Sequence, residues 1–158
     1  FSGVPALAAG QQYLVRYVNT AAVPNPGAGY LWYWLANRIT SYAAGATVPG
    51  GDFDIADVPL VSPAADATVT LPAVFCWTRR NYPNDNYRVV FRNLSTGEEA
   101  TTGFLGYVSC VSITGFPAHW PSGGAYAWWV RVYQGANPDA APDNYGDPAS
   151  QRNVRVNH

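Results

Sequence analysis

The sequence predicts an all-β protein made of many short strands, on the basis of three observations. Thirteen prolines and fifteen glycines punctuate the 158 residues, and short runs rich in Val, Tyr, Trp, Phe and Thr lie between them. Several of these runs alternate apolar and polar residues with a period of two, which is typical of a strand with one buried face. No stretch keeps the 3.6-residue period of an amphipathic helix.

Most of the expected strands fall in the second part of the chain, residues 58–158. They are 58–63, 69–78, 87–93, 101–113, 126–133 and 154–156. The run 87–93 (YRVVFRN) and the run 126–133 (YAWWVRVY) alternate most clearly. Their expected inward residues are Tyr87, Val89, Phe91, Tyr126, Trp128, Val130 and Val132. Such alternation indicates an antiparallel sheet that covers a core with one face.

The N-terminal third, residues 1–57, predicts further strands that stand apart from this set. Residues 12–19 (QYLVRYVN) and 30–40 (YLWYWLANRIT) are the two clear ones, and 52–55 is a candidate for a third. This third is too short for a second sandwich, which needs about 100 residues. Because a lone hairpin is marginally stable in water, these strands must pair with the rest of the chain or with another chain.

The segments LVSPA, VTLPAVFCWT, YRVVFRN and YAWWVRVYQG follow one another in residues 58–156. In this order they resemble the fibronectin type III-like repeats of bacterial surface proteins. The resemblance implies an immunoglobulin-like or fibronectin III-like antiparallel sandwich over 58–158, with residues 1–57 as a β-rich N-terminal extension. It also places Phe75 and Trp77 in the core, opposite the strand 126–132. These are packing motifs, so they specify a fold more than a function.

Charge and hydropathy exclude several classes of partner. The net charge is −1, and all nine basic residues are arginine. No basic stripe is present to neutralise phosphates or anionic lipid, which argues against nucleic acid and a charged membrane surface. The sequence contains no run of 18 apolar residues, which is about the length that a membrane-spanning helix needs. Methionine is absent even at position 1, which we interpret as the removal of an export signal, so we expect an extracellular or cell-surface protein.

Two cysteines, Cys76 and Cys110, are the only ones in the sequence. In an exported protein an even count indicates a disulfide, with two free thiols as the alternative. The fibronectin-like repeats usually lack cysteine, so the chain departs from them here. The resemblance nevertheless implies that Phe75 and Trp77 on one strand, and Val111 and Ile113 on the adjacent strand, face inward, so that both cysteines face outward. It therefore implies a cross-strand disulfide on the outer face, closing a loop of about 35 residues.

Residues that could carry catalysis are few and scattered. The sequence has no nucleophile elbow, P-loop, dinucleotide fingerprint or zinc motif. His119 and His158 have no evident nucleophilic partner, and the only glutamates, Glu98 and Glu99, fall in an expected hairpin turn. We therefore expect a protein that is not an enzyme and that needs no cofactor.

Calcium is a weak alternative to a cofactor-free chain. Two groups of loop aspartates supply the oxygen ligands that calcium prefers. They are Asp52, Asp54 and Asp57, and Asp139, Asp143 and Asp147. Neither group has the spacing of an EF-hand, and isolated loop aspartates usually cap turns. A glycosylation sequon begins at Asn93 in an expected turn.

The leading segment, residues 1–10 (FSGVPALAAG), has no evident helix or hairpin partner nearby. We expect it to add a strand to an open sheet edge of a neighbouring copy, through Phe1, Val4 and Leu7. The predicted function is therefore a structural subunit that builds a filament or surface array by exchanging N-terminal strands. The alternative for this segment is an arm folded back on its own domain.

Four aromatic residues complete the candidate contact set. Trp129 and Tyr133 are expected on the outward face of their strand, and Trp120 and Tyr145 in loops. Exposed aromatic rings form subunit contacts or stack on sugars, while ordinary cross-strand packing is the alternative reading. The second functional hypothesis is accordingly a carbohydrate-binding or adhesive module with a polysaccharide partner. A third is an accessory domain of a larger secreted enzyme.

Overall fold

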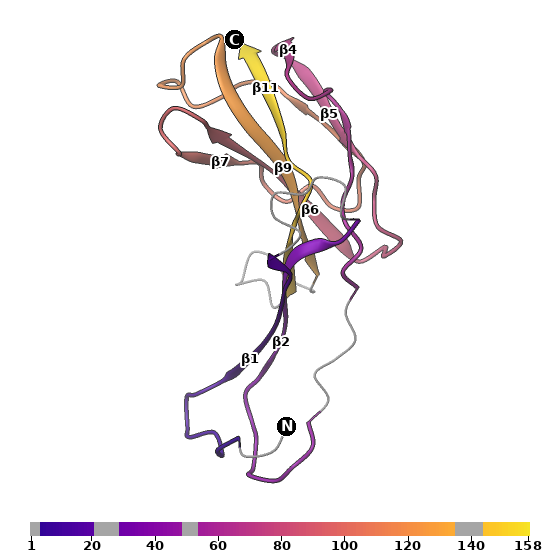
Figure 1. Ribbon diagram of the computed structural model, residues 1–158, viewed down its shortest axis with the longest axis vertical. Helices are drawn as coiled ribbons and strands as arrows, with labels where there is room; N and C mark the ends of the chain where they lie inside the picture. Colours follow the sequence, from indigo (N-terminus) through magenta and orange to yellow (C-terminus); the bar gives the residue numbers. More distant parts are fainter. Residues whose placement is uncertain (1–3, 21–28, 49–53, 135–143) are drawn as a thin grey trace.

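The computed structural model describes residues 4–20, 29–48, 54–134 and 144–158, and within them the chain is all-β with two sheets (Figure 1). The strands are β1 (Tyr13–Val18), β2 (Leu31–Ile39), β3 (Leu60–Ser62), β4 (Ala67–Thr70), β5 (Ala73–Trp77), β6 (Asp85–Asn93), β7 (Glu99–Thr101), β8 (Cys110–Ile113), β9 (Gly124–Gln134), β10 (Asn144–Pro148) and β11 (Arg152–Asn157). No helix in these ranges is long and apolar enough to cross a membrane. The predicted fold class is confirmed.

The larger sheet is built on the long antiparallel pair β6 and β9, which runs from Asp85 opposite Gln134 to Asn93 opposite Tyr126. β7 extends this sheet beyond β6. On the other side of β9, β11 pairs with its first half and β10 with its last residues. The smaller sheet has the order β3-β5-β8 and packs against the larger one to form a sandwich.

The core lies between the two sheets and contains the residues that the alternation predicted. The ring of Phe75 packs edge-on against Phe91 and Trp128, with ring centroids 5.1 and 5.0 Å apart. Trp77 packs against Tyr87 in the same way at 5.7 Å. All five side chains are buried. The prediction of an inward face along β5, β6 and β9 is therefore confirmed.

Residues 69–78 form two strands instead of the single one expected. β4 belongs to the larger sheet, where it runs parallel to β11, whereas β5 belongs to the smaller sheet. Pro72 lies between them and has no backbone N–H, so it cannot continue a hydrogen-bonded ladder. The chain crosses between the sheets at this point. The parallel pair β4–β11 is also a departure from a wholly antiparallel sandwich.

The disulfide has the predicted partners and position. Cys76 of β5 lies directly opposite Cys110 of β8, with 4.1 Å between their Cα atoms, and the two are bonded. Cys110 is exposed and Cys76 half-buried, while Phe75 beside Cys76 and Ile113 on the inward face of β8 are buried. The bond therefore joins adjacent strands on the outer face of the smaller sheet.

The N-terminal third forms a hairpin arm, β1 and β2, that continues the larger sheet. β2 pairs with β10 through Leu31–Leu35, and Leu31 and Trp34 enter the common core. Beyond this contact the hairpin extends away from the sandwich, in the lower half of Figure 1. Of the expected third strand, residues 52 and 53 lie outside the described ranges. Ile55 accepts a single backbone hydrogen bond from Leu31 (2.7 Å) and is not in a strand.

A buried polar cluster joins the arm to the sandwich. Arg80 donates from Nε to Oδ2 of Asp85 (3.0 Å) and from Nη1 to the carbonyl of Asp54 (2.9 Å). Its guanidinium carbon lies 5.0 Å from the ring centroid of Trp34 on β2. Gln134 donates to the other oxygen of Asp85 (2.7 Å). Burial raises the pKa of Asp85, although the hydrogen bond from Gln134 and the charge of Arg80 oppose this.

Candidate functional site

The sandwich has two lateral sides where the edges of its sheets meet, and side-chain hydrogen bonds cover one of them better than the other. At the side formed by β3 and β4, Arg152 of β11 donates hydrogen bonds to the carbonyls of Leu60, Val61 and Pro63. β3 has only three residues, and Pro63 follows it directly. Short edge strands with proline and charged neighbours resist pairing with other chains. This side is therefore a poor place for a further strand.

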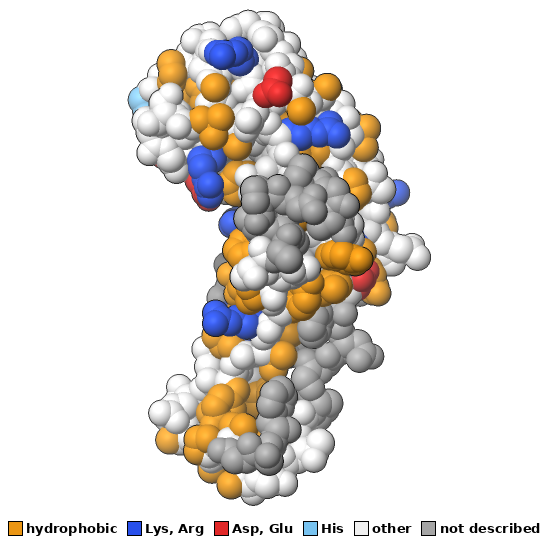
Figure 2. Space-filling model, in the orientation of Figure 1, with side chains coloured by type: hydrophobic (Ala, Val, Ile, Leu, Met, Phe, Trp, Pro, Cys, Tyr) orange, Lys and Arg blue, Asp and Glu red, His pale blue; other side chains and the backbone are white. Residues whose placement is uncertain are grey.

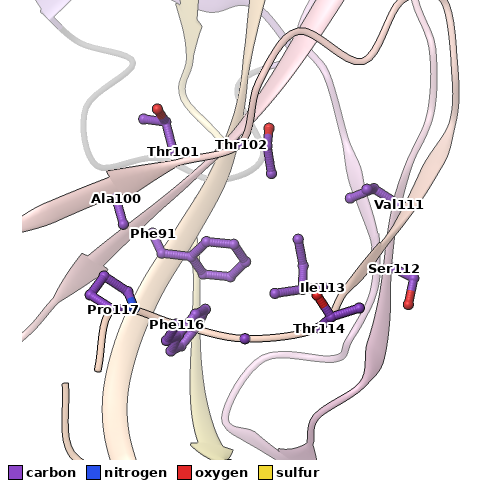
Figure 3. Close-up of a pocket in the computed structure, with 11 residues that line it drawn as sticks. Phe91, Ala100, Thr101, Thr102, Val111, Ser112, Ile113, Thr114, Phe116 and Pro117 are labelled. Atoms are coloured by element: carbon purple, nitrogen blue, oxygen red, sulfur yellow. The ribbon is translucent and has the colours of Figure 1, made fainter. Parts of the chain in front are cut away.

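On the opposite side, between β7 and β8, the sandwich opens into a groove of about 360 Å³. This β7–β8 groove is lined by Phe91, Ala100, Thr101, Thr102, Val111, Ser112, Ile113, Thr114, Gly115, Phe116 and Pro117. Phe91 and Ile113 point toward each other across it, and Phe116 lies along its lower border (Figure 3). No lining residue is charged, and the volume falls within the usual range of ligand sites, about 300–1,000 Å³.

The outer edge of β8 borders this groove, and among the described strands β8 pairs with β5 alone. Trp77 donates its backbone N–H to Ser109 (2.8 Å), so the next pair along, Cys76 and Cys110, is not hydrogen-bonded to each other. Because antiparallel pairs alternate in this way, the N–H and C=O groups of Cys110 and Ser112 point away from β5. The edge offers these groups to an added strand.

Glu98 fixes the loop that borders the groove, residues 114–121. Its Oε2 accepts a hydrogen bond from Trp120 Nε1 (2.9 Å) and lies 2.8 Å from His119 Nε2. These hydrogen bonds, first from His119 and then from Trp120, lower the pKa of Glu98. The neighbouring Glu99 is in an exposed ion pair with Arg92. Both glutamates thus have basic or donor partners that give them a structural role.

A second hollow, of about 440 Å³, lies on the hairpin arm. It is lined by Val4, Tyr13, Leu14, Val15, Arg16, Ile39, Tyr42, Gly45, Ala46, Thr47 and Val48. Leu14 and Val18 of β1 are exposed, and so is Val48, which follows β2. In Figure 2, hydrophobic side chains gather over the lower part of the molecule, which is the hairpin arm. The arm therefore carries apolar surface that its own sandwich does not cover.

The described part of the leading segment, residues 4–10, rests on this arm. Leu7 donates its N–H to the carbonyl of Tyr42 (3.1 Å), and Tyr13 donates its hydroxyl to the carbonyl of Pro5 (2.6 Å). Val4 and Leu7 are half-buried, whereas Pro5, Ala6 and the residues 8–10 are exposed. In the single chain, residues 4–10 thus lie against their own hairpin. Phe1 lies outside the described residues.

Three of the four aromatic candidates are buried, which corrects their expected exposure. Trp129 does face away from the core, but it packs with Val90 and Ala127, and the guanidinium of Arg92 lies 5.1 Å from its ring. Trp120 stacks on Tyr126 with ring centroids 5.1 Å apart. The alternation of β9 shows that Trp129 faces away from the core, but it could not show that Val90 and Arg92 of β6 bury this side chain.

Tyr133 and Tyr145 belong to a row of rings on the outer face of the larger sheet. Tyr133 is buried, and its ring lies 5.0 Å from Phe104 and 5.9 Å from Tyr145. Tyr145 is half-buried and also lies 5.5 Å from Tyr33. Burial, followed by a hydrogen bond from the Tyr145 hydroxyl to Tyr33, raises the pKa of Tyr145 to about 12. Tyr145 is placed in β10, not in a loop.

The described ranges contain no group of three acidic, histidine or cysteine side chains that could hold a metal ion. Asp54 accepts the N–H of Ala56 (2.9 Å), and Asp57 accepts the hydroxyl of Ser150 (2.5 Å). Asp147 is paired with Arg131 (2.6 Å). Asp52, Asp139 and Asp143 lie outside the described residues.

Comparison with known proteins gives no match to a family model, to a curated protein or to a solved structure. Sequence reasoning missed the β7–β8 groove and the bonds that Arg152 makes to β3. The Arg152 bonds join residues about 90 positions apart, and the groove lies between β7 and β8, which belong to different sheets, so no local pattern marks either feature.

Proposed function

We propose that this chain is a non-enzymatic extracellular structural subunit, built on a fibronectin III-like sandwich, that assembles with copies of itself through its N-terminal strands. The observation that carries the proposal is the hairpin arm. It extends beyond the sandwich and leaves Leu14, Val18 and Val48 exposed, and Leu14 and Val48 line a largely apolar hollow. Apolar surface of this kind is typical of a contact with another chain.

The outermost strand of the arm supports the same reading. β1 has six residues with one charge, Arg16, and no proline. Natural edge strands are usually blunted by charge, proline or shortness, and β1 has little of this protection. The disulfide is partly exposed on the surface, as expected for a protein of an oxidising compartment outside the cell. A net charge of only −1 gives copies little mutual repulsion.

Removal of residues 1–10 tests the proposal. We expect the full chain to form filaments or large particles in electron microscopy and light scattering, and the truncated chain to stay small. Near-ultraviolet circular dichroism of both proteins controls for the fold, because the core tryptophans Trp77 and Trp128 lie outside the deletion. Normal filaments from the truncated chain would refute N-terminal strand exchange.

A carbohydrate-binding or adhesive module is the second candidate, and its support is weaker. The flat rings that such a site needs are buried at Trp120, Trp129 and Tyr133. Tyr145 is half-buried between Tyr33 and Tyr133. A monodisperse 17.0 kDa monomer that binds a polysaccharide would favour this module over the structural subunit.

A further inference from the structure

The smaller sheet ends at β8, and the β7–β8 groove lies beside this edge, where a fourth strand would add to the sheet. The N–H and C=O groups of Cys110 and Ser112 point out of the sheet at this edge. A strand added there would pair with these groups and lay one face of side chains over Phe91, Ile113 and Phe116. Backbone pairing provides affinity and the groove selects the side chains, as in other cases of strand addition.

The chemistry of the groove restricts its occupant. All eleven lining residues are uncharged, and an unpaired charge buried among them would be costly. Residues 1–15 of the chain contain no Asp, Glu, Lys, Arg or His. We propose that the β7–β8 groove accepts residues 4–9 (VPALAA) of a second copy, which add to β8 as a fourth strand. This inference rests on the proposed self-assembly and names the site that receives the exchanged segment.

Proline determines how the segment pairs. Backbone groups of a strand alternate between its two edges, and Pro5 has no N–H to donate. The edge that faces β8 is therefore the one formed by Val4, Ala6 and Ala8. Side chains alternate as well, so Leu7 shares a face with Pro5 and Ala9. This face, with Leu7 as its largest side chain, enters the groove, and Val4 lies on the other face.

The occupant comes from another copy because of where the two parts lie. The chain that leads into β1 is at the lower end of the arm in Figure 1, whereas β7 and the groove belong to the sandwich in the upper half. Two hydrogen bonds hold the segment to its own hairpin, from Leu7 to Tyr42 and from Tyr13 to Pro5. Only Val4 and Leu7 of residues 4–10 are half-buried there, and the others are exposed.

A pair of matched glycine variants tests the acceptor site. Gly115 lines the groove and Gly103 does not. A side chain at either position meets nothing within 4 Å at its Cβ, so both Gly115→Glu and Gly103→Glu should fold. We expect Gly115→Glu to abolish assembly of the full chain in light scattering, because it places a charge in the otherwise uncharged groove that the added strand would cover, and Gly103→Glu to assemble like the parent.

Mixing two defective chains gives a stricter test. Leu7→Asp spoils the donor segment and Gly115→Glu spoils the acceptor, so each chain alone should stay monomeric. In a mixture, the intact segment of the Gly115→Glu chain can enter the intact groove of the Leu7→Asp chain. The expected product is a heterodimer of two 17.0 kDa chains that cannot grow further. A mixture that stays monomeric overturns the inference.

The results separate this inference from the proposed function. If deletion of residues 1–10 stops assembly while Gly115→Glu assembles normally, the groove is not the acceptor, although strand exchange stands. If the parent chain never assembles, the proposed function fails, and a labelled peptide FSGVPALAAG then tests the groove directly by fluorescence anisotropy. Gly115→Glu should weaken its binding at least about tenfold, and Gly103→Glu by less than about twofold. No binding to the parent overturns the inference.

Discussion

Removal of the disulfide should destabilise the fold by an amount that its position predicts. Cys76 and Cys110 are 34 residues apart, and the loop that they close restricts the unfolded chain. The chain-entropy relation for a loop of about 35 residues gives about 4 kcal/mol at 25 °C. For a chain of this length that corresponds to a fall in the unfolding midpoint of roughly 8–15 °C. Since Cys110 is exposed, Cys76→Ala/Cys110→Ala removes little packing.

Calorimetry of the parent and of this double variant, each with and without a reducing agent, measures the effect. Reduction should lower the midpoint of the parent to that of the variant and leave the variant unchanged. Val74→Ala provides a control on the same outer face, because Val74 is 56% exposed, and it should shift the midpoint little. A loss below about 1 kcal/mol in the double variant would refute the loop-entropy reasoning.

Three further predictions concern the core, the buried ion pair and the covered edge. Trp128→Ala should cost about 3–5 kcal/mol in urea unfolding, since its ring is fully buried between the sheets; a loss under about 1 kcal/mol would contradict this packing. The raised pKa of Asp85 means that the folded state binds its proton more tightly than the unfolded state. The contribution of Asp85 to stability should therefore fall as pH rises from about 3.8 through its folded pKa, and Asp85→Asn should remove this slope. Arg152→Ala should destabilise the fold by at least about 1.5 kcal/mol, because it leaves three carbonyls at the β3 edge without their donor. Arg155→Ala is the exposed control, and an equal loss of stability in both variants would refute the role of Arg152 at this edge.

Strand identity was predictable where one face alternates over a long run. β6 and β9 follow their patterns closely, because each inward residue from Tyr87 to Phe91 and from Tyr126 to Val132 is buried in the common core. The break at Pro72 was missed, since residues 69–78 look equally strand-like on both sides of it. Which sheet each half joins depends on its distant partners β11 and β8.

The candidate site was less predictable for a related reason. The outward direction of Trp129 and Tyr133 could be read from the strand period, but their burial could not. Arg92 and Phe104 cover them from elsewhere in the chain. Similarly, the residues of β8 do not show by themselves that its outer edge stays uncovered. Arg152 of β11 covers the edge at β3 by donating hydrogen bonds to its carbonyls. Within the described residues, Arg152 makes no such bond to β8.

The resemblance to fibronectin III-like repeats implied a disulfide on the outside of two adjacent strands. The sequence by itself determined an all-β chain and an inward aromatic face. These properties follow from the two-residue period of a strand, which is local and fixed by backbone geometry. Only the tertiary structure decided that the N-terminal hairpin joins the larger sheet through β10, and that one side of the sandwich is covered while the other is open. Those outcomes depend on which distant edges meet, and edge pairing is set by long-range contacts that no run of neighbouring residues encodes.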